Sequence, residues 1–214
     1  MFLLKRGVFL YIVAAGGSSG GGGRSYTTSV LRAASSEHLQ AQEQLVQNMF
    51  ALFARSTNVE HVRRQLERGA KINQPNELGY TAIITAADYN RLEVVKCLID
   101  SGADVNQPTP TGYTALIAAS YKGNVEMAQL LLRNGAHVDQ GYGGETPLVL
   151  AVRNRKLAMV EILVDGGASV EAANAEGHTP LEIARELLNR YPNDTVYQRM
   201  VQAMEDARPA YTLK

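Results

Sequence analysis

Residues 76–108 have apolar positions spaced as in two short helices. A turn-forming stretch that ends at Gly79 is followed by Thr81, which can cap a helix N-terminus, and by an apolar run as far as Tyr89. Apolar residues then recur on one helical face, at Leu92, Val94, Val95, Leu98 and Ile99. Gly102 is expected to follow this second helix in the left-handed conformation. The pattern therefore predicts a turn followed by two antiparallel helices.

The same pattern returns along most of the chain. Gly-Ala pairs begin at residues 69, 102, 135 and 167, which gives intervals of 33, 33 and 32 residues. A second series of glycines stands two residues before a threonine each time, at Gly79, Gly112, Gly144 and Gly177. Both series lose one residue once, between Gly135 and Gly144. Because one pair of short helices cannot bury its own apolar faces, we expect the repeats to stack.

The repeat resembles that of the ankyrin family, a unit of about 33 residues. The family's threonine–proline–leucine–histidine tetrapeptide is matched by segments that begin at Thr81, Thr114, Thr146 and Thr179, and all four lack the histidine. Its glycine–alanine–aspartate–valine–asparagine end is matched in full by residues 102–106. The resemblance implies an all-α solenoid of stacked helix-turn-helix units with β-turn fingers. The missing histidine removes a hydrogen-bonding group between repeats, which is expected to lower stability.

The chain divides into two parts that differ in composition and charge. Residues 1–36 carry four basic groups and no acidic one, and their glycine-rich run predicts a disordered segment. Residues 37–214 carry 17 basic and 21 acidic groups and form the predicted repeat domain, in which a continuous helix is expected to begin after Ser36. The expected units are residues 37–75, 76–108, 109–140, 141–173 and 174–207, with polar capping surfaces on the end units.

The basic, acid-free N-terminal segment predicts a mitochondrial presequence. Residues 24–28, Arg-Ser-Tyr-Thr-Thr, are similar to a processing site of mitochondrial matrix proteins. Two alternatives remain open, which are a flexible tail on a cytoplasmic protein and a secretory signal built on Lys5, Arg6 and the apolar residues 8–13. The apolar stretch 8–15 is much shorter than the roughly 20 residues of a membrane-spanning helix, so we expect no stable membrane span.

Composition and spacing argue against several classes of function. The 21 basic and 21 acidic residues balance, which argues against nucleic-acid binding because that affinity depends on clustered positive charge. The single cysteine, Cys97, has no partner for an internal disulfide and is expected to be a buried core residue. The four histidines lack the spacing of a metal or catalytic site. We therefore expect no enzyme activity, no cofactor and no bound metal.

The resemblance implies a concave groove lined by the turns and the first helices. The second, third, fifth, thirteenth and fourteenth residues of each unit are expected to face it, and five of the ten tyrosines fall on this row. Tyrosine is favoured in binding surfaces because it combines a large apolar face with a hydroxyl group. Tyr89, Tyr121 and Tyr142 carry this argument, since tyrosine is common in the family at the fifth position. The candidate partner-binding residues are Tyr80, Asp88, Tyr89, Tyr113, Tyr121, Lys122, Tyr142, Glu145, Arg153 and Asn154.

The sequence favours a non-catalytic scaffold or adaptor that binds a protein partner through the groove. A rigid stack presents a preformed surface, so little ordering entropy is lost on binding. Two alternatives remain open, which are a permanent structural subunit of a large mitochondrial complex and a regulator that blocks a partner enzyme. The domain is expected to be monomeric when alone.

Overall fold

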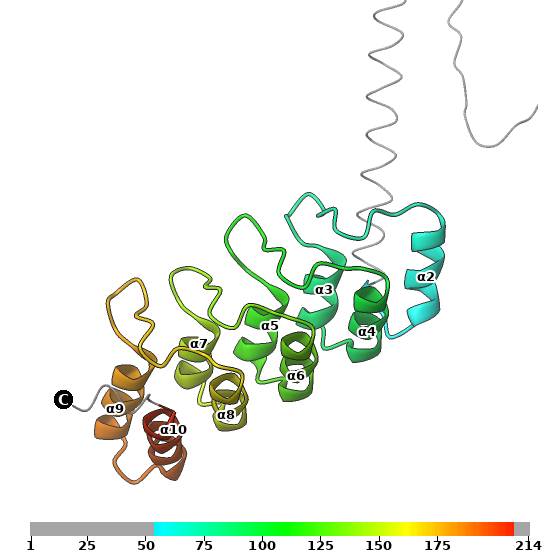
Figure 1. Ribbon diagram of the computed structural model, residues 1–214. Coiled ribbons are helices and arrows are strands. Elements are labelled where there is room, and N and C mark those ends of the chain that lie inside the picture. The colour runs from blue at the N-terminus through cyan, green and yellow to red at the C-terminus, as the bar shows by residue number, and fades with distance from the viewer. Residues whose placement is uncertain (1–53, 208–214) are drawn as a thin grey trace, which may run out of the picture. The chain divides into compact units, whose positions relative to one another are not determined.

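The structure is a computed structural model that describes residues 54–207. This part of the chain contains α-helices and turns and no β-strand, as the sequence predicts (Figure 1). The predicted disordered segment 1–36, the helix expected after Ser36 and the start of the first unit lie outside the described residues. The helices are α2 (Val59–Glu67), α3 (Ala82–Asp88), α4 (Leu92–Asp100), α5 (Ala115–Lys122), α6 (Val125–Arg133), α7 (Pro147–Arg153), α8 (Leu157–Asp165), α9 (Pro180–Arg190) and α10 (Thr195–Asp206).

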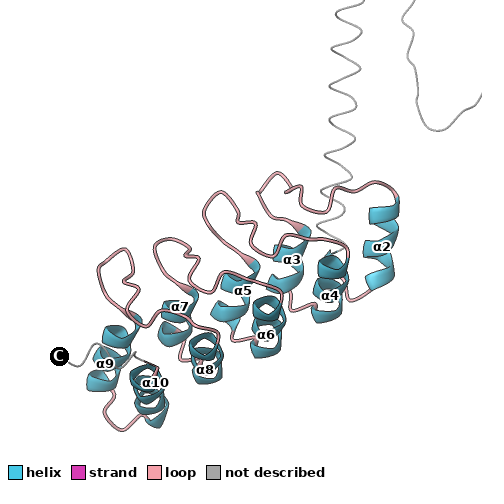
Figure 2. Cartoon of the chain, in the orientation of Figure 1, coloured by secondary structure: helices cyan, strands magenta, loops and turns pink. Residues whose placement is uncertain are grey.

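The helices form two rows. The first helices of the units, α3, α5, α7 and α9, follow one another, and the second helices α4, α6, α8 and α10 lie alongside, with α2 before α4 (Figure 1). Each helix from α3 to α10 contacts its partner within the unit and its counterparts in the neighbouring units, and α2 contacts α4. The longer loops, which we call fingers, project from the same edge of the stack (Figure 2). The predicted solenoid of helix-turn-helix units is confirmed.

A threonine begins each first helix from α3 onward, as the sequence predicts. The hydroxyl oxygens of Thr81, Thr114, Thr146 and Thr179 accept hydrogen bonds from backbone N–H groups three residues later. Thr179 also donates its backbone N–H to the Glu182 carboxylate at 2.8 Å. This reciprocal bonding lowers the pKa of the Glu182 carboxyl group from its usual value. The two hydrogen bonds form a capping box at the N-terminus of α9.

The position of the family's missing histidine is filled by apolar residues in three units. Ile84, Ile117 and Val149 are completely buried, and Ile84 and Val149 belong to a core that runs continuously through the units. Burying such a side chain stabilises a fold by about 1.5–3 kcal/mol relative to leaving it exposed. Apolar burial therefore takes the place of the hydrogen bond whose loss was expected to lower stability.

The glycine near each finger tip meets two structural requirements. Gly79, Gly112 and Gly144 have φ of 81°, 90° and 83°, the left-handed region that glycine adopts most easily. A Cβ atom on Gly144 would also lie 2.3 Å from the Cβ of Ala175 in the next finger. Gly177 belongs to the last finger, and a Cβ there would meet no atom within 4 Å. The regular spacing of this glycine series thus reflects both the turn and the close approach of the following finger at Gly79, Gly112 and Gly144, and the turn alone at Gly177.

One repeat is a residue shorter than the others, and the shortening lies in the turn of one finger. Thr109 and Tyr113 are joined by a backbone hydrogen bond across three residues, whereas Tyr142 and Glu145 exchange two hydrogen bonds across only Gly143 and Gly144. Both of these glycines have positive φ, 58° and 83°, as in the tight turn of a hairpin. Tyr142 is therefore the counterpart of Thr109, which is the first residue of the preceding unit. The prediction that Tyr142 is the second residue of its own unit is wrong.

Asparagine side chains join neighbouring units at the base of the fingers. Asn106 accepts a hydrogen bond from the His137 N–H at 2.7 Å and donates one to the Gly135 carbonyl at 2.9 Å. Asn73 makes the same pair of bonds to the next unit, at 2.8 and 3.5 Å. Asp139, which stands at this position one unit later, accepts from the Ser169 N–H but has no N–H to donate.

We therefore expect Asp139→Asn to stabilise the domain. The new amide can donate to the carbonyl of Gly167, the counterpart of Gly135, and a net gain of about 0.5–1.5 kcal/mol is typical of one hydrogen bond. Urea unfolding followed by circular dichroism measures the change. The reverse variant Asn106→Asp is the matched control and should destabilise the domain, so equal stability of both variants and the wild type would contradict the prediction.

Candidate binding groove

The predicted binding residues lie on the fingers and at the C-terminal ends of the first helices. We call the surface that these two sets of residues form the groove. Three neighbouring units contribute to it, with one finger and one helix end from each unit (Figure 1). The finger residues are Tyr80, Tyr113, Tyr142 and Glu145, and the helix-end residues are Asp88, Tyr89, Tyr121, Lys122, Arg153 and Asn154.

The five tyrosines of the groove divide by exposure. Tyr80 and Tyr113 are half-buried against the core, whereas Tyr89, Tyr121 and Tyr142 are 40%, 53% and 38% exposed. The ring of Tyr113 lies between those of Tyr80 and Tyr142, with centroid distances of 6.0 and 5.1 Å. The tyrosines at the common family position thus support the fingers, and the other three present surface to solvent.

Asp88 links two neighbouring units of the groove. The hydroxyl of Tyr113 donates to its carboxylate at 3.1 Å, and the Lys122 ammonium lies 3.1 Å from the same oxygen. Lys122 also donates to the backbone carbonyl of Asp88. Burial, and then the Asp88 charge, raise the pKa of Tyr113 well above its usual value, so its hydroxyl remains a donor. The ends of α3 and α5 and one finger are held in a fixed arrangement.

Arg55 is a groove residue that the sequence interpretation missed. Its guanidinium carbon lies 4.4 Å from the ring centroid of Tyr89, and the Lys122 ammonium lies 5.9 Å from the same centroid. The repeat could have placed Arg55 on the groove row, because Arg55 stands 33 residues, one repeat, before Asp88. The first unit lacks the threonine that marks the register, so the row was not extended to it.

Arg153 joins two further fingers. Its guanidinium lies 2.8 Å from Glu145 in its own unit and 3.1 Å from Glu176 in the next finger. Asn154 instead donates its side-chain amide to the Leu150 carbonyl at 2.8 Å, near the end of α7. Arg153 is therefore part of the groove's charged surface. The side-chain amide of Asn154 instead donates to a backbone carbonyl near the C-terminal end of its own helix.

A small apolar hollow opens among the tyrosines. It has a volume of about 180 Å³ and is lined by Tyr113, Ile117, Tyr121, Tyr142, Gly143, Glu145 and Leu150. Ile117 and Leu150 are buried residues of α5 and α7, so core side chains form part of its lining. We call it the tyrosine hollow. The sequence interpretation named four of its seven residues as candidate binding residues and placed Gly143 on the groove row, but it missed Ile117 and Leu150.

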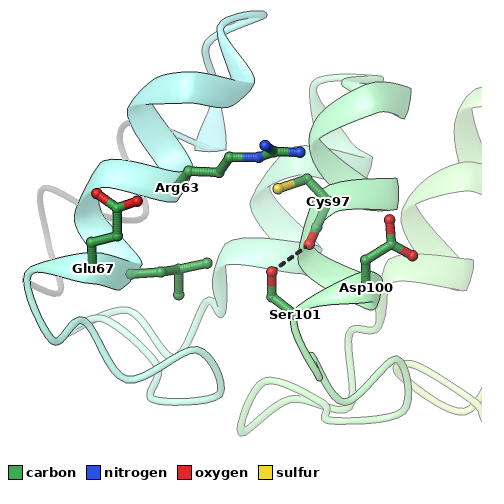
Figure 3. A pocket seen from close by; sticks show the side chains of 6 residues that line it. Arg63, Glu67, Cys97, Asp100 and Ser101 are labelled. Atoms are coloured by element: carbon green, nitrogen blue, oxygen red, sulfur yellow. Dashed lines mark hydrogen bonds between the residues drawn. The ribbon is translucent and has the colours of Figure 1, made fainter.

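A second hollow lies between the second helices α2 and α4 (Figure 3). Its volume is about 300 Å³, and Arg63 and Cys97 point into the space between the two helices. Cys97 is only 8% exposed, which confirms the prediction of a buried core thiol. The charged groups Arg63, Glu67 and Asp100 share this open lining with apolar atoms. Because the lining mixes positive, negative and apolar groups, it does not favour one class of ligand. The tyrosine hollow is therefore the stronger candidate site.

Within residues 54–207, no three His, Cys, Asp or Glu side chains gather in a way that could hold a metal ion. None of the helices α2–α10 is both long enough and apolar enough to cross a bilayer.

Comparison with known families identifies the repeat. A family model for three copies of the ankyrin repeat matches residues 48–142, and a model for many copies matches residues 133–184. The chain belongs to the ankyrin-repeat family. Ankyrin repeats generally mediate protein–protein interactions and are typically non-catalytic. A comparison with curated proteins gave no significant match.

Proposed function

We propose that the chain is a non-catalytic adaptor that binds a protein partner through the groove of its ankyrin stack. The observation that carries the proposal is the exposure of Tyr89, Tyr121 and Tyr142 on neighbouring units, where Tyr121 and Tyr142 line an apolar hollow. Aromatic side chains at such a site can bury a large apolar area against a partner, and they lose little rotamer entropy when they are fixed. Partner binding of this kind needs no cofactor and no reacting group.

The rigidity of the groove supports the proposal. Asp88 connects α3, α5 and a finger, and Arg153 connects two more fingers. These exposed ion pairs add little to stability by themselves. They do fix side chains that would otherwise lose rotamer freedom when a partner binds, and such preorganisation improves affinity.

Replacing Tyr89, Tyr121 and Tyr142 together with alanine is expected to abolish most partner binding. Proteins recovered with the wild-type chain from native lysate should fall at least about tenfold in abundance, because aromatic anchors dominate interface energies. Quantitative mass spectrometry of the captured proteins measures this loss, and circular dichroism first establishes that the variant is folded.

Tyr191→Ala is the matched control for this experiment. Tyr191 is 52% exposed, nearly the same as Tyr121, but it lies between α9 and α10, outside the tyrosine hollow. Its replacement should leave the recovered proteins unchanged. Equal recovery of every partner by the folded triple variant and the wild type would refute binding through the groove.

We also propose that residues 1–36 direct the chain into mitochondria. The support is the sequence alone, with four basic groups, no acidic group and a processing-like stretch at residues 24–28. N-terminal sequencing of the protein purified from its own cells is expected to find a start near Thr27. An intact Met1 would contradict import with cleavage.

A further inference from the structure

We propose that the tyrosine hollow holds one aliphatic side chain of an extended partner segment, and that a lysine or arginine stands one or two residues from that anchor. The inference rests on the proposed binding role of the groove and specifies which chemistry the groove selects. It follows from the size of the hollow, its lining, and the charges around it.

The size of the hollow fits a single side chain. Its volume of about 180 Å³ is smaller than the roughly 300–1,000 Å³ of typical small-molecule sites. Apolar atoms form most of its surface, and Ile117, Leu150 and three tyrosines are among the lining residues. An aliphatic side chain would remove this surface from water, and each buried CH₂ group contributes about 0.8 kcal/mol.

The walls of the hollow are already in place. The Tyr113 hydroxyl bonds to Asp88, and the Tyr113 ring meets the Tyr142 ring at an interplanar angle of 77°, edge to face. Ile117 is completely buried, and Leu150 is 8% exposed. Tyr121 is the most exposed of the three tyrosines in the lining, at 53%, so its ring is free to close over an inserted side chain. The anchor therefore enters a largely preformed site.

The charges beside the hollow favour a cation on the partner. Glu145 lines the hollow, and the single guanidinium of Arg153 is shared between Glu145 and Glu176. On the other side, Lys122 and Asp88 neutralise each other. Within the cluster of Glu145, Arg153 and Glu176 one carboxylate charge is thus in excess, whereas the further cation Arg55 lies beside Tyr89 and not in the lining of the hollow. The Glu176 side chain is 64% exposed and accessible to a partner. A basic residue next to the anchor would complement this excess, whereas an acidic residue would be repelled.

An extended segment fits this surface better than a helix. A helical partner needs a row of apolar sites at helical spacing. Here the groove residues on either side of the hollow are charged pairs, Asp88 with Lys122 and Arg153 with Glu176. A single apolar anchor with neighbouring charges is the pattern that an extended segment can supply.

Selection from a phage-displayed library of random peptides on the full-length chain tests the proposal. The enriched peptides should share a leucine, isoleucine, valine or methionine with a lysine or arginine one or two residues away. A fluorescent consensus peptide should then bind Tyr121→Ala at least about tenfold more weakly than the wild type. Tyr191→Ala, the matched control, should bind it as the wild type does.

The role of charge is tested with a second pair of changes. Glu176→Gln should weaken binding of the consensus peptide severalfold, and the same variant should make no difference to a peptide whose basic residue is replaced by glutamine. A consensus without an aliphatic residue, an acidic consensus, or equal binding by Tyr121→Ala would overturn the proposal. Absence of any enriched peptide would overturn it too, while capture of intact partners by the wild type and not by the triple tyrosine variant would still support the groove.

Discussion

Replacing Gly144 with alanine is expected to be among the most destabilising single changes in the fingers. The backbone φ of +83° costs about 1–3 kcal/mol for a residue with a Cβ atom. The new atom would also stand 2.3 Å from the Cβ of Ala175, and overpacking of this kind costs about 1–3 kcal/mol more. The Ala175 N–H donates to the Gly144 carbonyl at 2.9 Å, so separating the two fingers would strain that bond. Urea unfolding measures the total loss.

Two controls separate backbone strain from crowding. Gly177→Ala has nearly the same φ, +85°, and no atom near its added Cβ, so it should cost only the backbone part. Ala175→Gly in the Gly144→Ala background removes the crowding atom and should recover the difference. If Gly144→Ala and Gly177→Ala cost the same, the next finger does not constrain Gly144.

Truncating Leu131 to alanine is expected to cost about 2–5 kcal/mol. Leu131 is completely buried in α6, near the middle of the stack, where α6 contacts α4, α5 and α8. In a linear stack each unit is stabilised only by its neighbours, so a central cavity weakens two interfaces together. Urea unfolding followed by circular dichroism should show a lower midpoint of unfolding.

Leu78→Ala is the matched control for this truncation. Leu78 lies on a finger and is 76% exposed, so the same chemical change should alter stability by less than about 0.5 kcal/mol. A loss at Leu131 as small as that at Leu78 would show that the centre of the stack is not held together by its buried leucines.

The sequence could predict the helices because their signals are local and repeated. Thr81 caps a helix within its own turn, and Gly102 adopts its positive φ of 88° directly after the second helix. The interval of about 33 residues then places each helix beside its counterpart. The repeat register also distinguished two groups of tyrosines. Tyr80 and Tyr113 occupy the position where the family often has tyrosine and support the fingers, whereas the other tyrosines of the row could face a partner.

The rest depends on atoms that come together only when the units stack. The tyrosine hollow combines Ile117 with Leu150, which lie in different units, and Arg55 reaches Tyr89 from a unit whose register the sequence does not mark. The missing residue could be placed only between Gly135 and Gly144 until backbone hydrogen bonds fixed it in the finger turn. By itself, the sequence determined a periodic stack of helix pairs, since each signal acts within one unit. The tertiary structure alone decided the shape and charge of the groove, because its contacts join residues about one repeat apart.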